Sequence, residues 1–279
     1  TLISILDRSQ TAMGGRLLKK WISRPLKRKE QIEKRLGAVK DFFDNKNERK
    51  KIVEDLKSIA DLERLLSKVS TGKVVARDIV QIKISLKKII EIKDKLKKFS
   101  SASVKSLSDN LIEINELIIR IEKCVNENFV IGVDSYGIIN KGFNSELDDL
   151  KDILLNGKTW IENFQSKERA RTGIGSLKVD FNKVFGYYII VTKSNLDKVP
   201  TDYVRKQTLV NAERYITDDL KVYEEKILNA EEKIDDLERK IFNELRISIL
   251  DFTDQIQKNA SLIATLDSLL SFAEVSLIL

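Results

Sequence analysis

Residues 173–216, GIGSLKVDFNKVFGYYIIVTKSNLDKVPTDYVRKQTLVNAERYI, interrupt a chain that otherwise has the pattern of long helices. Apolar and charged residues alternate over residues 177–181, and residues 186–192 (GYYIIVT) are rich in β-branched and aromatic side chains. Both patterns are typical of strands. Residues 203–216 are expected to add one or two more strands, so the segment predicts a small β-rich module inserted between two helices.

Apolar or small residues recur at alternating spacings of three and four on both sides of this module, which is the pattern of a heptad seam. The seam before the module consists of Leu147, Leu150, Leu154, Gly157, Ile161 and Phe164. The seam after it consists of Leu220, Tyr223, Ile227, Ala230, Ile234, Leu237 and Ile241. Two seams of similar length joined by a compact module predict an antiparallel coiled-coil stalk, with Leu147 opposite about Ile241.

The second seam changes phase beyond Ile241, where its apolar residues continue as Leu245, Ile249, Phe252 and Ile256. A phase change of this kind marks a change of packing partner. We therefore expect the second helix to run on to about residue 258, past the end of the first helix, and to join a helical core.

The remaining residues predict that core. Only two prolines and eleven glycines occur in 279 residues, and few helices are broken where these residues are scarce. Helices are expected over residues 11–22, 29–43, 48–56, 59–69, 76–96 and 108–126, with a Ser-rich linker at 100–108 and a short hairpin at 129–140. The predicted fold is mainly α (α+β overall), a multihelical core with a long antiparallel coiled coil and a small β-rich module inserted at its tip.

Enzyme motifs are absent from the sequence. There is no histidine, no G-x-x-x-x-G-K-[ST] phosphate loop and no G-x-G-x-x-G run. The single Cys124 excludes an internal disulfide, and its apolar neighbours predict a buried thiol. Gly14 and Gly15, which are costly within a helix, predict the close approach of another backbone. We expect no catalytic residue, no metal site and no cofactor site in this chain.

The β-rich module carries seven positive and four negative residues. Long cationic side chains at turns and strand ends can reach phosphates, and an amide can bond one without adding charge. The candidate DNA-binding residues are Lys178, Lys183, Lys193, Lys198, Arg205, Lys206, Asn211 and Arg214. Solubilising charge on a small sheet is the alternative. No recognition helix or aromatic stacking platform accompanies these residues, so any DNA contact is expected to ignore base sequence.

Several stretches of the chain resemble the central part of bacterial MutS-type DNA mismatch repair proteins. The stretches are TAMGGRLLKKWISRPL (residues 11–26), DLERLLSKV (61–69), GFNSELD (142–148), LKVDFNKVFGYYIIVTK (177–193) and VPTDYVRKQTLVNAERYIT (199–217). The last two are the most specific, and the resemblance extends over essentially the whole chain. One departure is Val210, where relatives often carry a basic residue, so one backbone contact beside Asn211 is expected to be missing.

The resemblance implies a division into helical core (residues 1–143), first lever helix (144–172), clamp (173–216), returning lever helix (217–258) and helical core again (259–279). It implies a clamp that touches the backbone of double-stranded DNA, and a lever that couples this clamp to an ATPase domain. The parent protein is expected to be a cytoplasmic homodimer that uses ATP and Mg²⁺. Mismatch-reading and ATPase domains are expected to flank this chain.

Two rival functions remain open at this point. The chain could be a structural coiled-coil interaction module without DNA binding of its own. A membrane-surface binder is a weaker rival, because no basic amphipathic helix with exposed aromatic residues supports it. No apolar run reaches the length of a membrane span. We expect no membrane and no small-molecule substrate among the partners.

Overall fold

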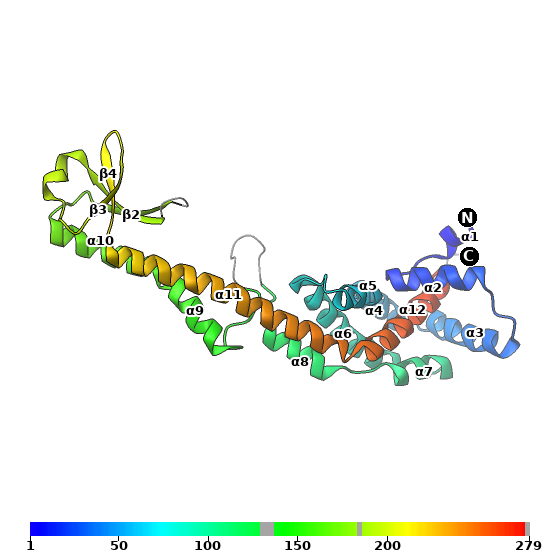
Figure 1. Ribbon diagram of the computed structural model, residues 1–279. Helices are drawn as coiled ribbons and strands as arrows, with labels where there is room; N and C mark the ends of the chain where they lie inside the picture. Colours follow the sequence, from blue (N-terminus) through cyan, green and yellow to red (C-terminus); the bar gives the residue numbers. More distant parts are fainter. Residues whose placement is uncertain (129–136, 183–185, 277–279) are drawn as a thin grey trace. The chain divides into compact units, whose positions relative to one another are not determined.

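The computed structural model describes residues 1–128, 137–182 and 186–276, and it divides into two compact units (Figure 1). The helical unit comprises residues 1–140 and 241–279, and the sheet unit comprises residues 141–240. Most of the predicted hairpin at 129–140 and the candidate Lys183 lie outside the described residues. The mainly α fold with a small antiparallel sheet is confirmed.

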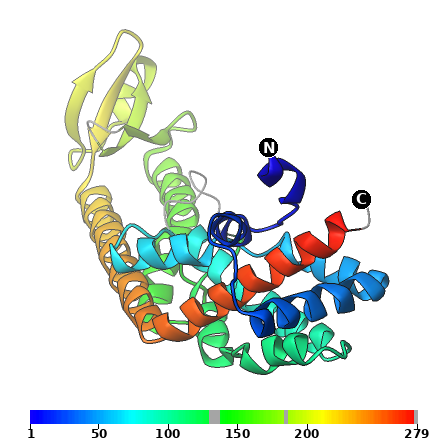
Figure 2. The same cartoon turned by 90° about the vertical axis from the view of Figure 1, so that its right-hand side faces the viewer.

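The helical unit is built around its last helix. Helix α12 lies beside other helices of the unit (Figure 2) and contacts α2, α3, α4 and α5. Many of its residues are buried, among them Ile256, Ile263 and Leu270. The helices of this unit are α1 (Leu2–Leu6), α2 (Ala12–Ser23), α3 (Lys29–Asp44), α4 (Lys46–Leu56), α5 (Leu62–Ser70), α6 (Ala76–Leu96), α7 (Ala102–Asn110), α8 (Asn115–Cys124) and α12 (Thr253–Val275). The single thiol of Cys124 is buried as predicted, and burial raises its pKa to about 11.

Gly14 lets α12 lie close against α2. A Cβ at this position would clash with the carboxylate of Asp267, which accepts hydrogen bonds from the Gln10 and Thr11 backbone amides at 2.9 and 2.8 Å. The predicted close approach is therefore confirmed, but the approaching group is a side chain and not a backbone. Burial raises the pKa of Asp267 above its usual range, against the lowering effect of these hydrogen bonds.

The Ser-rich stretch at 100–108 is mostly helix and not a linker. Helix α7 begins at Ala102, and its Val104 and Leu107 are buried where α7 packs against α6 and α3. Serine has a low helix propensity, but the hydroxyl of Ser108 donates to the Lys93 carbonyl at 2.9 Å. Burial of the apolar residues between the serines outweighs the local preference.

The sheet unit contains the interrupting module and the two arms that flank it. Its elements are α9 (Ser145–Leu155), α10 (Gly157–Thr172), β1 (Lys178–Asn182), β2 (Gly186–Thr192), the 3₁₀ helix η1 (Lys193–Lys198), β3 (Val204–Thr208), β4 (Ala212–Ile216) and most of α11 (Asp218–Leu250). The strands form one antiparallel sheet in the order β1-β2-β4-β3 (Figure 1). The Leu220 amide donates to Thr217 Oγ1 at 3.3 Å, so Thr217 caps the returning helix.

The two arms run antiparallel, as their side-chain contacts show. Lys151 forms an ion pair with Glu238 at 2.7 Å, which agrees with the predicted register, and the ring of Trp160 stacks on Tyr223 with centroids 3.7 Å apart. The first arm is not one helix, because a turn at Asn156 separates α9 from α10. A Cβ on Gly157 would lie 2.6 Å from Tyr223 Oη, so the residue after the turn has to be small.

The returning helix is shorter than predicted. Helix α11 ends at Leu250 and α12 begins at Thr253, although residue 258 was the expected end. No proline or glycine marks this break; Thr253 Oγ1 donates to the Leu250 carbonyl at 2.8 Å. The turn lets α12 change direction and pack among the other helices. Residues 241–250 of α11 belong to the helical unit, so the helix does continue into the core, as the phase change predicted.

Candidate nucleic-acid interface

One face of the sheet is fixed against the arms by an apolar core. Ile189 and Val191 of β2 are fully buried together with Phe164 of α10 and Leu220 of α11. Because side chains alternate along a strand, Lys178, Ile190, Arg214 and Gln207 form a row of paired positions across the opposite face. The sheet therefore offers one face, its edges and its loops to a partner.

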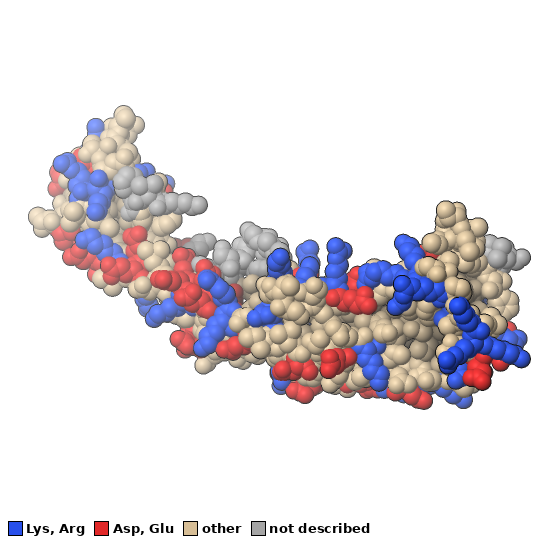
Figure 3. Space-filling model, turned by 45° about the vertical axis from the view of Figure 1, so that its right-hand side comes forward, with Lys and Arg blue, Asp and Glu red and all other residues tan. Residues whose placement is uncertain are grey.

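Four of the candidate lysines are exposed and have no ion-pair partner within the described part of the chain. They are Lys178 at the start of β1, Lys193 after β2, Lys198 at the end of η1 and Lys206 on the edge strand β3. Lys206 sits at a register shift between Arg205 and Gln207, where the ladder of β3 with β4 is irregular. Cationic side chains are visible over the sheet unit in Figure 3.

Lys193 and Asn211 are brought together at one end of the sheet. The Lys193 amide donates to the Asn211 carbonyl at 3.2 Å, and both residues are exposed. The neighbouring Val210, in the turn between β3 and β4, is 85 % exposed. This turn presents an amide side chain and an apolar side chain, so Val210 supplies no cation beside Asn211.

The sequence did not reveal a group of hydroxyls and an amide at the same end of the sheet. Asn195 Nδ2 donates to Thr192 Oγ1 at 3.0 Å, and the Ser176 and Ser194 hydroxyls lie 3.5 and 3.2 Å from the same oxygen. These groups are neutral donors of the kind that bond phosphate oxygens. The run TKSN at residues 192–195 was the available signal, but only the pairing of β1 with β2 brings Ser176 beside it.

The two candidate arginines already have partners within the sheet. Arg214 donates from Nη1 to Gln207 Oε1 at 2.8 Å, and its guanidinium lies 4.3 Å from the centroid of the Tyr188 ring. Arg205 lies 3.5 Å from the buried carboxylate of Glu213, which also accepts from Tyr215 Oη at 2.5 Å. These contacts give both arginines a role in holding the sheet, in addition to the predicted DNA contact.

A second group of residues attaches the module to α10. Glu168, only 3 % exposed, accepts from Tyr203 Oη at 2.7 Å and from Arg171 Nη2 at 2.7 Å. Arg171 also bonds Asp202 at 2.9 Å. These two carboxylates raise the pKa of Arg171, and Arg171 lowers that of Asp202. The network joins one arm to the loop before β3.

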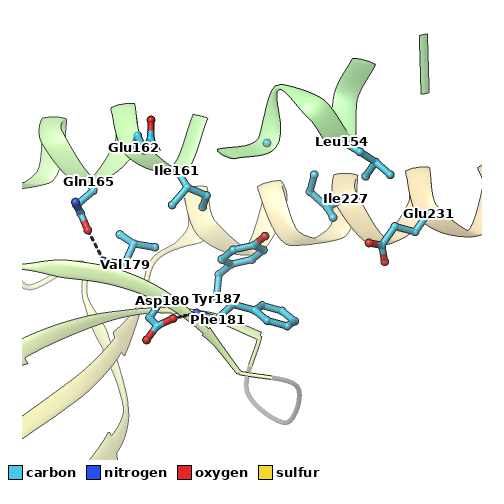
Figure 4. A pocket seen from close by; sticks show the side chains of 11 residues that line it. Leu154, Ile161, Glu162, Gln165, Val179, Asp180, Phe181, Tyr187, Ile227 and Glu231 are labelled. Carbon is cyan, nitrogen blue, oxygen red and sulfur yellow. Dashed lines mark hydrogen bonds between the residues drawn. The ribbon is translucent and has the colours of Figure 1, made fainter. Parts of the chain in front are cut away.

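The other side of the attachment is aromatic and encloses a cavity of about 490 Å³ (Figure 4). Gln165 Oε1 on α10 accepts from the Val179 amide of β1 at 2.9 Å, and the ring of Tyr187 lies between the sheet and the arms. The carboxylates of Glu162, Asp180 and Glu231 line this cavity. Burial, with Glu231 and Glu224, raises the pKa of Tyr187. Negative groups repel phosphate, so the cavity is not a candidate for contact with nucleic acid.

The described residues contain neither a metal-binding cluster nor a membrane-spanning helix. No group of three or more acidic or Cys side chains in this part of the chain is arranged to hold a metal ion. Among the same residues, no helix combines the length and apolar character that crossing a bilayer requires.

Comparison with known proteins relates nearly the whole chain to one protein family. The family described as MutS domain III matches residues 1–273. Three curated relatives, each named DNA mismatch repair protein MutS, are similar over 99 % of this chain. Those of Caldanaerobacter subterraneus subsp. tengcongensis and Listeria monocytogenes are each 46 % identical, over 276 and 277 residues and 32 % of their own length. That of Salinibacter ruber is 45 % identical over 276 residues and 30 % of its length. The chain thus spans about a third of these relatives.

Proposed function

We propose, from the premise that this chain belongs to the MutS domain III family, that its sheet unit binds the backbone of duplex DNA without regard to base sequence. The family is one of DNA mismatch repair proteins. The observation that carries the proposal is the set of four exposed lysines, Lys178, Lys193, Lys198 and Lys206, which have no ion-pair partners among the described residues. Unpaired cations on a rigid sheet can neutralise phosphates and release counterions.

The chemistry of this surface favours phosphate over base contact. Lysine ammonium groups, the Asn211 amide and the hydroxyls around Thr192 are donors suited to phosphate oxygens. The aromatic rings of Tyr187 and Tyr188 are engaged, the first against Phe181 and Tyr223 and the second beneath Arg214. Neither is offered as a platform for stacking bases.

We further propose that the arms act as a lever for this clamp. Helix α11 is continuous over 33 residues, about 50 Å at 1.5 Å per residue, and its last residues belong to the helical unit. The Glu168 network and the Gln165 bond support this role, because a sheet attached at several points moves with its arms. In the longer protein we propose a cytoplasmic homodimer in which ATP and Mg²⁺ are used by another domain, while this chain catalyses nothing.

A salt titration of DNA binding tests the clamp. We expect Lys193→Gln combined with Lys206→Gln to lower the slope of log affinity against log salt by about 1.8, because about 0.9 is lost for each phosphate contact. Fluorescence anisotropy with labelled duplexes of about 30 base pairs measures this slope. The double change should weaken the binding of duplexes of different sequence equally.

The matched control removes two charges elsewhere. Lys73 and Lys105 are exposed and have no ion-pair partners in the part of the chain that the structure describes, so their double change to Gln should leave the slope unchanged. If duplex binding is absent or independent of salt, the clamp proposal fails and the structural coiled-coil module becomes the better description.

A further inference from the structure

The strongest concentration of charge in the chain lies outside the sheet unit. Residues 19–29, KKWISRPLKRK, contain six cationic residues and no carboxylate, and account for six of the net seven positive charges of the whole chain. The six are Lys19, Lys20, Arg24, Lys27, Arg28 and Lys29, which we name the basic turn. In the rest of the chain, the numbers of positive and negative residues are nearly equal.

The basic turn joins the end of α2 to the start of α3 on the surface of the helical unit. All six residues are exposed. Five have no ion-pair partner among the described residues, and Lys29 has only a long contact of 3.7 Å with the exposed Glu33. Figure 3 shows cationic side chains gathered at the end of the helical unit where Figure 1 shows this connection.

Some other cations of the same unit form ion pairs. Arg16, also on α2, bonds both Asp61 and Glu63, and Lys68 bonds Asp78 at 2.8 Å. Isolated exposed cations such as Lys73 and Lys105 also have no ion-pair partner among the described residues, so what sets the basic turn apart is that six cations occur together in eleven residues without a carboxylate.

Electrostatics within the basic turn is unfavourable. Lys27, Arg28 and Lys29 lie at the N-terminus of α3, where the helix dipole already places positive charge. The N-cap residue is Arg28, which makes no capping hydrogen bond with its side chain, and Glu30 is the one acidic residue of the first turn. Like charges that repel one another are stabilised when a polyanion neutralises them.

The chemistry of the basic turn favours phosphates over a protein or a membrane. Four of its six cations are lysines, which are depleted from the cores of protein–protein interfaces. Its large apolar residues, Trp21, Ile22 and Leu26, are half-buried, and Trp21 lies under Arg35 at 3.6 Å. No exposed apolar anchor is left for a protein pocket or for insertion into lipid.

We infer that the basic turn is a second binding surface for the phosphate backbone of duplex DNA, on the helical unit and independent of the clamp. The inference rests on the proposed function only in taking duplex DNA as the polyanion. A second patch would add its own counterion release to the salt dependence of binding, and it would hold DNA when the clamp residues are removed.

Three double variants of the whole chain test this surface. The basic-turn pair is Lys27→Gln with Arg28→Gln, the clamp pair is Lys193→Gln with Lys206→Gln, and the control pair is Lys73→Gln with Lys105→Gln. Each removes two positive charges from exposed positions. Anisotropy titrations of a duplex of about 30 base pairs, between about 50 and 200 mM salt, give the slope of log affinity against log salt. We expect the basic-turn pair to lower this slope by about 1.8, and the effects of the basic-turn pair and the clamp pair to add when they are combined. Circular dichroism confirms that each variant keeps its helices.

The outcomes separate the two proposals. If the basic-turn pair leaves the slope at the value of the control pair while the clamp pair lowers it, the inference is overturned and the clamp stands. If only the basic-turn pair lowers the slope, the inference stands and the clamp proposal fails. Vesicles of phosphatidylglycerol provide the test against a membrane. If the wild-type chain binds them more tightly than duplex DNA at equal salt, and the basic-turn pair loses this binding, the choice of DNA is overturned.

Discussion

At the scale of single residues, the charged groups of the sheet unit divide by burial. Glu168 and Glu213 are buried and satisfied by tyrosine hydroxyls and arginines, so they hold the module together. The four exposed candidate lysines, Lys178, Lys193, Lys198 and Lys206, have no such partners among the described residues and are free to meet a ligand. A buried carboxylate that loses a donor is costly, whereas an exposed lysine can be changed at little cost to stability.

Tyr203→Phe tests this division. The change removes the hydroxyl that donates to Glu168 at 2.7 Å, and we expect the sheet unit to lose about 1–3 kcal/mol of unfolding free energy. Tyr223→Phe is the matched control, because Tyr223 Oη is buried without a hydrogen-bond partner among the described residues and its loss should cost nothing. Urea denaturation followed by tyrosine and tryptophan fluorescence measures both. Equal stability of the two variants would contradict the role given to Glu168.

At the scale of elements, the heptad seams predict which residues of the arms are buried, but they do not predict where the helices end. Leu147 and Ile234 are fully buried, and Ala230 and Ile241 nearly so, as the seams predict. Helix boundaries depend on contacts that the seams do not encode. The turn at Asn156 precedes Gly157, which faces Tyr223 Oη, and the end of α11 at Leu250 allows α12 to pack separately.

Ile234→Ala measures how much the seam contributes. Removing a fully buried isoleucine side chain should destabilise the sheet unit by about 2–5 kcal/mol, because a cavity is left between the arms. Glu232→Ala, at an exposed position of the same helix, is the control and should be nearly neutral. Thermal melts of the two variants provide the comparison. A neutral Ile234→Ala variant would refute the antiparallel pairing of the arms at this position.

At the scale of the whole molecule, each of the two compact units has its own buried apolar residues in the part of the chain that the structure describes. Those of the helical unit include the fully buried Ile82 of α6, and those of the sheet unit lie between the sheet and its arms and include the fully buried Ile189 of β2. Separate cores allow one unit to open locally while the other stays folded.

Ile82→Ala and Ile189→Ala should therefore act on different units. Each change removes a similar side chain from a fully buried site and should cost about 2–5 kcal/mol. We expect faster amide hydrogen exchange in α6 and α12 for the first variant, and in β2 and β4 for the second. Exchange measured by mass spectrometry distinguishes the two patterns; a uniform increase along the chain in either variant would show a single cooperative unit.

The amino-acid sequence by itself determined the fold class, the antiparallel arms, the strands and the buried Cys124. These depend on period and composition, which are local properties of the chain. The family motifs pointed to the same arrangement. The candidate lysines could also be named from the sequence, because exposed cations at turns need little tertiary information.

Only the tertiary structure decided which polar groups are already in use. It paired Arg214 with Tyr188 and Gln207, brought Ser176 beside Thr192, and made residues 102–110 helical despite their serines. It also exposed the basic turn without partners among the described residues. The physical reason is that burial and ion pairing depend on groups far apart in the chain, whereas periodicity depends only on neighbours.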